Sequence, residues 1–234
     1  MDDTPVAIVT AAGSGIGEAC ARRLNDDGYL PVLLSPSGSA VDVADDLGGD
    51  GYEGSVTEPD DLAALVETTH ERYGRIDAVV NNTGHPPSGD LLEISDEEWY
   101  EGMDLVLMNT VRMARLVTPI MEEQGEGAIV NVSTFSAFEP SLDFPVSSVL
   151  RAGLGSYTKL YADRYASAGI RMNSVLPGFA DSYDVDEETK AEIPMGRAAR
   201  TEEIADAVAY LLSEESSYIT GQNLRVDGGI TSSV

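Results

Sequence analysis

The stretch Val6-Ala-Ile-Val-Thr-Ala-Ala-Gly-Ser-Gly-Ile-Gly17 decides the fold of this chain. Its first five residues are an apolar run, which predicts a buried strand at 6–10. Residues 18–27 have the pattern of a helix that ends at Gly28. The glycines between strand and helix would let the backbone approach a pyrophosphate, which the helix N-terminus attracts. The stretch therefore predicts a nucleotide-binding turn, although a plain strand–helix connection could carry the same glycines.

The same alternation of strand and helix continues outward from this stretch. Further strands are expected at 29–35, 51–54, 76–80, 128–132, 170–175 and 222–226. Helices are expected at 41–47, 58–73, 97–123 and 148–168 and from Thr201 onward, with a bend in the third of them near 104–109. This order predicts an α/β fold with a doubly wound parallel sheet of about seven strands, helices on both faces, and a single domain over residues 1–234.

The composition argues against nucleic acids and membranes as partners. With 41 acidic and 14 basic residues, the net charge of −27 repels nucleic acids and anionic membranes, so neither is expected as a partner. No apolar run is long enough to span a membrane, and the acidic start is not a signal peptide. The single Cys20 cannot form an internal disulfide, which favours a cytoplasmic protein. We interpret the acidic surface as an adaptation to high salt, which screens self-repulsion.

Several segments at the predicted strand ends carry recognisable motifs. They read Asn81-Asn-Thr-Gly84, Arg171-Met-Asn-Ser-Val-Leu-Pro-Gly-Phe179, Ile193-Pro-Met-Gly-Arg197 and Ile219-Thr-Gly-Gln-Asn-Leu-Arg-Val-Asp-Gly-Gly229. Together with residues 10–17, these segments resemble the short-chain dehydrogenase/reductase family, and its 3-oxoacyl-[acyl-carrier-protein] reductases in particular. The resemblance covers residues 6–230 and implies a Rossmann-type sheet. It also implies a homodimer or homotetramer that associates through the helices at 97–123 and 148–168.

The resemblance implies a nicotinamide dinucleotide as cofactor. Its binding residues would be Thr10, Ala11, Ser14, Gly15, Ile16, Gly17, Ser35, Ser55, Val56, Asn82, Gly84, Arg151, Pro177, Gly178 and Phe179. Ala11 replaces a family glycine, and Ser55 replaces an Asp that holds the adenine amino group. After the strand at 29–35 there is neither the acid that binds the ribose of NAD nor the Arg that binds the phosphate of NADP. Because no acid would repel the phosphate, NADP is favoured over NAD, while the serines at 35, 37 and 39 could bind it or simply form a turn.

The catalytic residues depart from the family pattern. In the family, a Ser polarises the carbonyl, a Tyr thirteen residues later moves the proton, and a Lys four residues further lowers the pKa of the Tyr. The same spacing gives Thr134, Ser147 and Arg151 here, and Asn109 matches an Asn of the water relay. An aliphatic hydroxyl has a pKa far above the ~10 of Tyr, and Arg does not relay protons. Ser147 is therefore a poor substitute for the Tyr.

Three other side chains could supply the proton. His85 follows the Asn-Asn-Thr-Gly motif, Asp143 lies between Thr134 and Ser147, and Tyr183 follows the Pro-Gly turn. A His has an ordinary pKa of ~6.5, which suits acid–base work near neutral pH. Each of the three could equally be an ordinary loop residue in solvent.

The sequence thus predicts an NAD(P)(H)-dependent oxidoreductase that acts on a small carbonyl, an alcohol or a related double bond. One alternative is a catalytically inactive homologue that binds the cofactor or a partner. The other is an enzyme without a cofactor that uses Ser147 and Arg151 for a non-redox elimination. No metal site is expected.

Overall fold

Seven parallel strands form the centre of the molecule in the computed structural model, which describes residues 4–233. The strands are β1 (Val6–Thr10), β2 (Leu30–Ser35), β3 (Asp50–Glu53), β4 (Ala78–Asn81), β5 (Gly127–Val132), β6 (Ile170–Pro177) and β7 (Asn223–Val226). Their order in the sheet is β3-β2-β1-β4-β5-β6-β7. The chain changes direction across the sheet between β1 and β4, and ligands of such sheets bind at the carboxyl ends of the strands beside that point.

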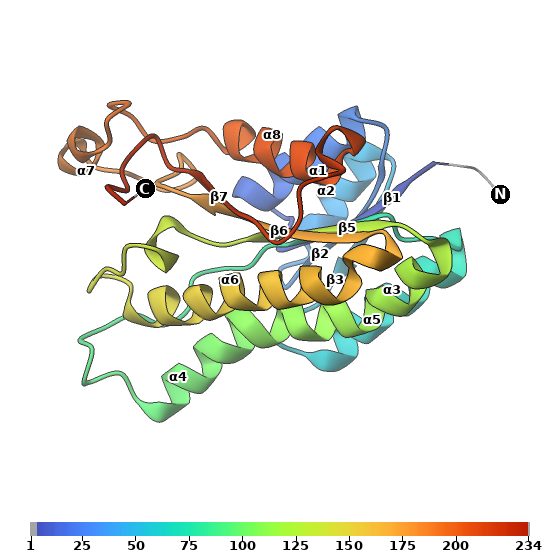
Figure 1. Cartoon of the computed structure of the whole chain (residues 1–234), viewed down its shortest axis with the longest axis horizontal. Coiled ribbons are helices and arrows are strands. Elements are labelled where there is room, and N and C mark those ends of the chain that lie inside the picture. Colours follow the sequence, from blue (N-terminus) through green and yellow to red (C-terminus); the bar gives the residue numbers. More distant parts are fainter. Residues whose placement is uncertain (1–3, 234) are drawn as a thin grey trace.

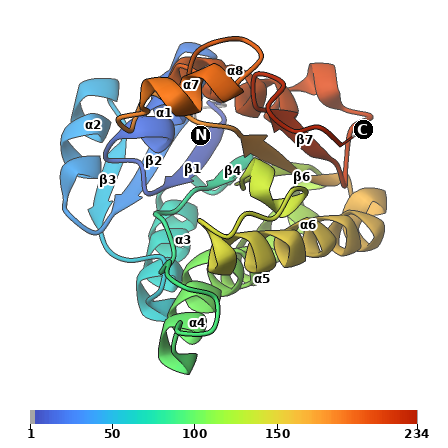
Figure 2. The ribbon, with the colours of Figure 1, turned by 90° about the vertical axis from the view of Figure 1, so that its left-hand side faces the viewer.

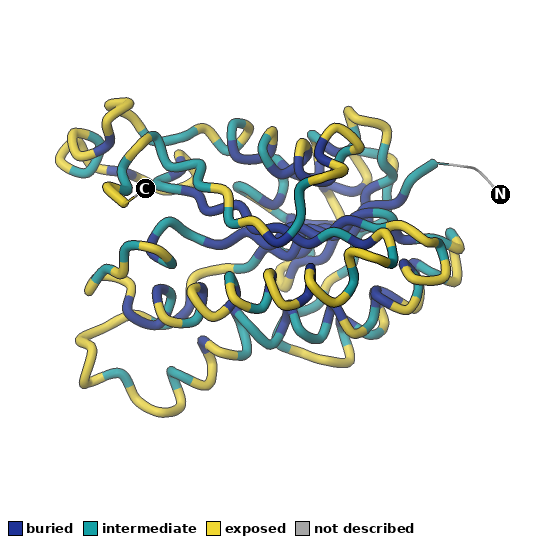
Figure 3. The backbone as a smooth tube through the Cα atoms, viewed as in Figure 1, coloured by how far each residue is buried: buried dark blue, intermediate teal, exposed yellow. Residues whose placement is uncertain are grey.

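Helices cover both faces of the sheet (Figure 1). One layer holds α1 (Gly15–Asp26), α2 (Ser39–Leu47) and α8 (Thr201–Leu212), and the other holds α3 (Pro59–Tyr73), α5 (Asn109–Gln124) and α6 (Pro145–Tyr165). Side chains of β1 alternate between the two cores, with Ala7 and Val9 in one and Val6 and Ile8 in the other. The sheet is accordingly buried and the outer helix faces are exposed (Figure 3). Within residues 4–233, no helix has the length and apolar character needed to cross a membrane.

The predicted fold class is confirmed, and the differences lie at the ends of helices and strands and in one additional short helix. Helix α1 begins at Gly15 rather than at residue 18, and Gly15 itself has a φ of 58°, a left-handed conformation that glycine accepts. Helix α6 begins at Pro145 rather than at 148, since a proline is well suited to the first turn of a helix. The expected bend near 104–109 is a π-helical segment, Asp104–Met108, between α4 (Asp96–Met103) and α5. The short helix α7 (Glu187–Glu192) was not predicted.

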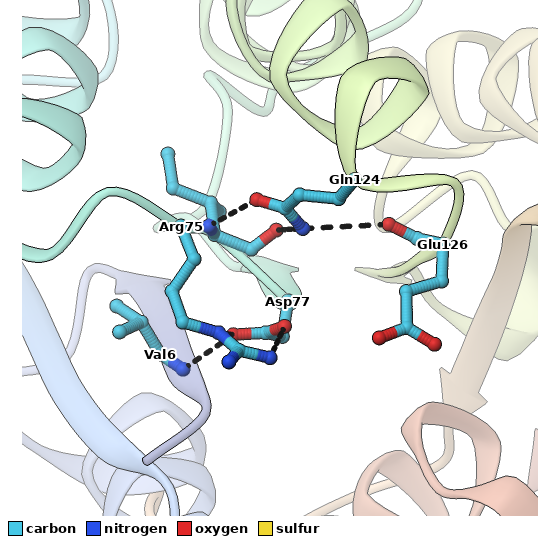
Figure 4. Close-up of polar contacts among 6 residues, drawn as sticks. Val6, Arg75, Asp77, Gln124 and Glu126 are labelled. Carbon is cyan, nitrogen blue, oxygen red and sulfur yellow. Dashed lines mark hydrogen bonds and ion pairs between the residues drawn. The ribbon is translucent and has the colours of Figure 1, made fainter. Parts of the chain in front are cut away.

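Polar contacts close the amino edge of the sheet (Figure 4). The backbone N–H of Val6 donates to Asp77 (2.7 Å), and Arg75 forms two hydrogen bonds to the same carboxylate (2.9 and 2.7 Å). The Gln124 amide pairs with the backbone N–H and C=O of Ile76 (2.8 and 3.0 Å). These contacts join β1, β4 and α5 and have a structural role at this edge.

A buried hydrogen-bond chain fixes the middle of the sheet to α6. Asn81 donates to Asn131 (2.9 Å), Asn131 donates to Thr158 (3.0 Å), and the Thr158 hydroxyl lies 2.9 Å from that of Ser174. Each member is buried, so loss of one partner would leave an unsatisfied polar group at a cost of about 1–3 kcal/mol. These hydrogen bonds fix the position of α6, which carries Ser147 and Arg151.

Candidate functional site

The turn between β1 and α1, residues 11–17, is called the glycine turn here, and it lies beside the end of β4. The Thr10 hydroxyl donates to the carbonyl of Asn82 (2.7 Å) and accepts from its N–H (3.0 Å), so the two strand ends are held together. A Cβ on Gly17 would lie 2.2 Å from the carbonyl oxygen of Ala11, which only glycine avoids. Ala11 has a φ of 47°, in the left-handed region, at a cost of about 1 kcal/mol. The structure therefore shows why glycine would suit position 11.

The crevice at the carboxyl ends of β1 and β4 is bordered by the first turn of α1, whose backbone N–H groups have no partner within the helix. Ser14 precedes the helix in extended conformation, is exposed, and forms no side-chain cap. The first N–H groups of a helix have no partner within it, and they attract anions. The Ser182 Cβ lies 3.3 Å from the position that a Cβ on Gly15 would occupy, so the segment after β6 passes over the turn. This turn can hold a pyrophosphate.

Serines line the end of the crevice beyond β2. Ser35 is buried and accepts a hydrogen bond from the N–H of Ala40 (2.9 Å) at the start of α2. The hydroxyls of Ser37 and Ser39 lie 2.9 Å apart. Ser55, followed by Val56, lies after β3, and its N–H donates to Asp61 (2.8 Å). The residues predicted to bind the adenosine end thus lie at the ends of β2 and β3.

The predicted catalytic residues come from the end of β5 and the start of α6. Thr134 follows β5 in extended conformation, Ser147 lies in the first turn of α6, and Arg151 lies one turn later. Arg151 is buried, and its Nη1 donates to the carbonyl of Val132 (2.6 Å). Burial lowers the pKa of Arg151 from 12.5 to about 10, so the side chain keeps its positive charge at neutral pH.

Four buried polar atoms in residues 4–233 have no hydrogen-bond partner: Thr83 Oγ1, Ser133 Oγ, Ser136 Oγ and Arg151 Nε. They come from the segments after β4 and β5 and from α6, which meet at the carboxyl edge that Figure 2 faces. Buried polar atoms are otherwise almost always paired, so this set is suited to a polar ligand. A nicotinamide dinucleotide, with its ribose hydroxyls and carboxamide, fits these donors and acceptors. Sequence reasoning missed Thr83, Ser133 and Ser136, although they adjoin or lie within the motifs around Gly84 and Thr134.

Asn109 is buried at the start of α5, directly after the π-helical segment. Its Nδ2 donates to the carbonyl of Leu105 (2.5 Å), and its Oδ1 accepts from Thr110 (2.9 Å). The side chain therefore satisfies a carbonyl of the irregular turn. Such π segments are frequent at functional sites, and the relay role of Asn109 stays a prediction.

The structure brings two of the three candidate proton donors into contact with each other. The rings of His85 and Tyr183 are in edge-to-face contact, with centroids 4.8 Å apart. Asp143 is exposed, and its carboxylate accepts from Ser141 (3.1 Å) within its own turn. The structure thus pairs His85 with Tyr183 and directs Asp143 elsewhere.

The segment after β6 lies at the end of the crevice near Thr134 and Arg151, which is called the reaction end here. Gly178 donates its N–H to Val226 (3.0 Å), and a Cβ there would lie 2.9 Å from the Cα of Asp227. The Phe179 ring packs against that of Phe135, with centroids 5.6 Å apart. A cavity of about 220 Å³ adjoins Phe179 and is bordered by Ile193, Met195, Arg197, Ala199, Glu203, Val226, Asp227 and Gly228. This cavity lies beside the Pro177–Gly178–Phe179 turn rather than at the glycine turn.

Comparisons with known proteins agree with this geometry. The family model described as enoyl-(acyl carrier protein) reductase matches residues 10–231. The cis-4-hydroxycyclohexanecarboxylate dehydrogenase of Sinomonas cyclohexanicum is 36% identical and covers 97% of this chain and 96% of its own. The 3-oxoacyl-[acyl-carrier-protein] reductase of Thermotoga maritima is 33% identical, over 96% and 97%. The solved structure of YwfH, an NADPH-dependent reductase involved in bacilysin biosynthesis, has the same fold, with a TM-score of 0.94 at 24% identity over 99% of this chain and 100% of that one.

Proposed function

Because the chain belongs to the short-chain dehydrogenase/reductase family, we propose that it is an NAD(P)(H)-dependent oxidoreductase acting on a small carbonyl or alcohol, or a related double bond. The observation that carries this proposal is the set of four unpartnered buried polar atoms, one of which is Arg151 Nε. They lie at the carboxyl edge, where sheets of this kind bind dinucleotides. The glycine turn at Gly15 and Gly17 supports the same proposal.

In this proposal, each part of the crevice holds one part of the cofactor. The amides at the start of α1 bind the pyrophosphate, Arg151 binds the nicotinamide ribose, and the Phe179 N–H binds the carboxamide. When bound, the nicotinamide supplies or accepts a hydride. The Thr134 hydroxyl donates a hydrogen bond to the substrate oxygen, and the buried charge of Arg151 stabilises negative charge that develops there.

Nucleotide binding is the first test. Titration of the protein in high salt with NADPH and NADH, followed by nicotinamide fluorescence, is expected to give a micromolar Kd for at least one of them. Gly17→Ala is expected to weaken binding by about 100-fold or more, since the added methyl would meet the Ala11 carbonyl.

The matched control is Gly153→Ala on α6, where a Cβ would meet nothing within 4 Å. It is expected to bind as the unmodified protein does. Circular dichroism shows whether the Gly17 variant is folded. Absence of binding by the unmodified protein would contradict the proposal and point to another ligand or a protein partner.

We propose NADP(H) as the preferred form of the cofactor. No acid follows β2, and Ser35, Ser37 and Ser39 offer hydroxyls. Ser35→Asp is expected to raise the Kd of NADPH by about tenfold or more, because a carboxylate would repel the extra phosphate, while NADH binding is kept. Ser35→Asn is the uncharged control, since its amide oxygen can still accept from Ala40. Equal changes for both nucleotides would contradict the preference.

A catalytically inactive cofactor-binding protein is the second candidate. It is favoured by one observation: Arg151, at the position of the family Lys, is tied to the Val132 carbonyl and cannot relay a proton. Turnover with a panel of carbonyls and alcohols separates the two candidates, because the inactive protein would bind nucleotide without oxidising or reducing it.

We also propose a homodimer or homotetramer. Apolar side chains are exposed on the helices that the resemblance assigns to association, with Tyr100 and Met103 on α4 and Val149 and Leu160 on α6. Such surfaces on neighbouring helices are suited to self-association. The net charge of −27 opposes it, so salt would favour the oligomer.

A further inference from the structure

We propose that His85 transfers the substrate proton, with Tyr183 as its positioning residue, in place of the Tyr that the family uses on α6. This inference rests on the proposed function. It starts from one juxtaposition: the segment after β4, the segment after β6 and the buried Arg151 of α6 meet at the reaction end of the crevice. Ser147, at the family Tyr position, has an aliphatic hydroxyl that cannot do this work near neutral pH.

The segment that carries His85 is fixed against the start of α6. Pro86 is buried, and it shares the space above Gly102 with Val146 and Leu150, which precede and follow Ser147 in the sequence. Two residues further, the Ser88 hydroxyl donates to the carbonyl of Asp143 (2.6 Å). His85 is therefore held beside the first turn of α6 rather than on a free loop.

The imidazole is also held from the opposite side of the crevice. Its ring meets that of Tyr183 at 65°, with centroids 4.8 Å apart. The neighbouring Ser182 passes over the glycine turn, 3.3 Å from the Cβ position of Gly15. The segment at 181–183 thus extends from the pyrophosphate turn to His85, and this places the imidazole at the border of the cofactor crevice.

Desolvation and one neighbouring charge together set the protonation state of His85. His85 is exposed at one side, and desolvation of its ring followed by the positive charge of Arg151 lowers the pKa of His85 below its ordinary value of 6.5. Arg151 on α6 and Tyr183 after β6 are the titratable side chains that face it. The imidazole is therefore neutral at pH 7 and acts as a base.

A base at this place suits the oxidation of an alcohol. The substrate hydroxyl gives its proton to an imidazole nitrogen of His85, while its carbinol carbon gives a hydride to the oxidised nicotinamide. The C–O single bond becomes a carbonyl, and the imidazolium then releases the proton to solvent. The reverse reduction needs the imidazolium as acid, so it is favoured at lower pH.

The first test measures His85 itself and needs no substrate. The chain has two histidines, so His70→Gln assigns both imidazole signals in an NMR titration. The His85 pKa is expected below 6.5, to rise in Arg151→Met, and to stay low in Arg151→Lys, which keeps the charge. An ordinary pKa that does not respond to Arg151→Met would identify a solvated loop histidine and overturn the proposal.

The second test is kinetic. His85→Gln is expected to lower kcat/KM for alcohol oxidation by about 100-fold or more and to remove the rise of the rate with pH, with nucleotide affinity unchanged. His70→Gln, on α3, is the matched control and should keep both. Tyr183→Phe keeps the ring contact, so its loss is expected to be far smaller than that of His85→Gln. An equal loss would assign the proton to the phenol and overturn the proposal.

The outcomes separate this inference from the proposed function. If the unmodified protein binds nucleotide and turns over while His85→Gln loses less than about threefold, the oxidoreductase stands and the role of His85 falls. If no nucleotide binds, the proposed function and the role of His85 fall together. Only a low pKa of His85 combined with a large kinetic loss supports the inference.

Discussion

Ser147→Tyr combined with Arg151→Lys is expected to raise carbonyl reduction by about 100-fold or more. A positioned acid contributes about 10²–10⁴-fold to the rate, and the aliphatic hydroxyl of Ser147 cannot act as one near neutral pH. A phenol has an ordinary pKa of ~10, which a neighbouring ammonium lowers. The double substitution would return both groups to the positions that the family spacing assigns to them.

The structure explains why both substitutions are needed. Arg151 is buried, and the hydrogen bond from its Nη1 to the Val132 carbonyl holds the guanidinium in one place. Its Nε has no partner. The guanidinium does not exchange its proton, whereas the ammonium of a Lys is mobile and can lower the pKa of a Tyr. Ser147 is partly exposed in the first turn of α6, one turn before Arg151.

The matched control for this experiment is Ser147→Phe with Arg151→Lys, which adds the same ring without the hydroxyl. Initial rates of NADPH oxidation with a carbonyl panel give the comparison. A gain in the Tyr variant alone assigns it to the phenol. Equal rates in both variants, with nucleotide still bound, would contradict the prediction and favour a different chemistry in this pocket, such as the elimination without a cofactor.

The melting temperature is expected to rise by about 10 °C or more between ~0.1 M and ~2 M KCl. The chain has 27 more acidic than basic residues, and salt shortens the Debye length from about 10 Å at 0.1 M to about 3 Å at 1 M. Repulsion between exposed carboxylates therefore weakens as salt is added. For a domain of this size, the shift corresponds to about 3 kcal/mol.

The exposed acids that form no ion pair identify the source of this repulsion. Asp42 and Asp45 lie exposed on α2 and have no basic partner, whereas Asp46 pairs with Arg22 at 3.5 Å. Asp42→Asn with Asp45→Asn is expected to raise the melting temperature at low salt and to leave it unchanged at high salt. Scanning calorimetry gives both values. A melting temperature that is indifferent to KCl would contradict the salt adaptation.

Most of the fold could be predicted from the sequence because its signals are local. The apolar run at β1 and the glycines of the turn each depend on neighbouring residues, and the structure confirms both. The short helix α7 could not be predicted in the same way. It has no buried residues, so it leaves no apolar periodicity in the sequence.

The candidate site likewise combines residues that short segments predict with residues that only the tertiary structure brings together. The sequence by itself determined the Rossmann-type fold, the glycine turn, and the presence of Ser147 and Arg151 where the family has Tyr and Lys, because each is written in a short segment. Only the tertiary structure decided that His85 meets Tyr183 and that Thr83, Ser133, Ser136 and Arg151 each keep a buried polar atom without a partner. These groups lie far apart along the chain, and they meet only because parallel strands bring their carboxyl ends to one edge of the sheet.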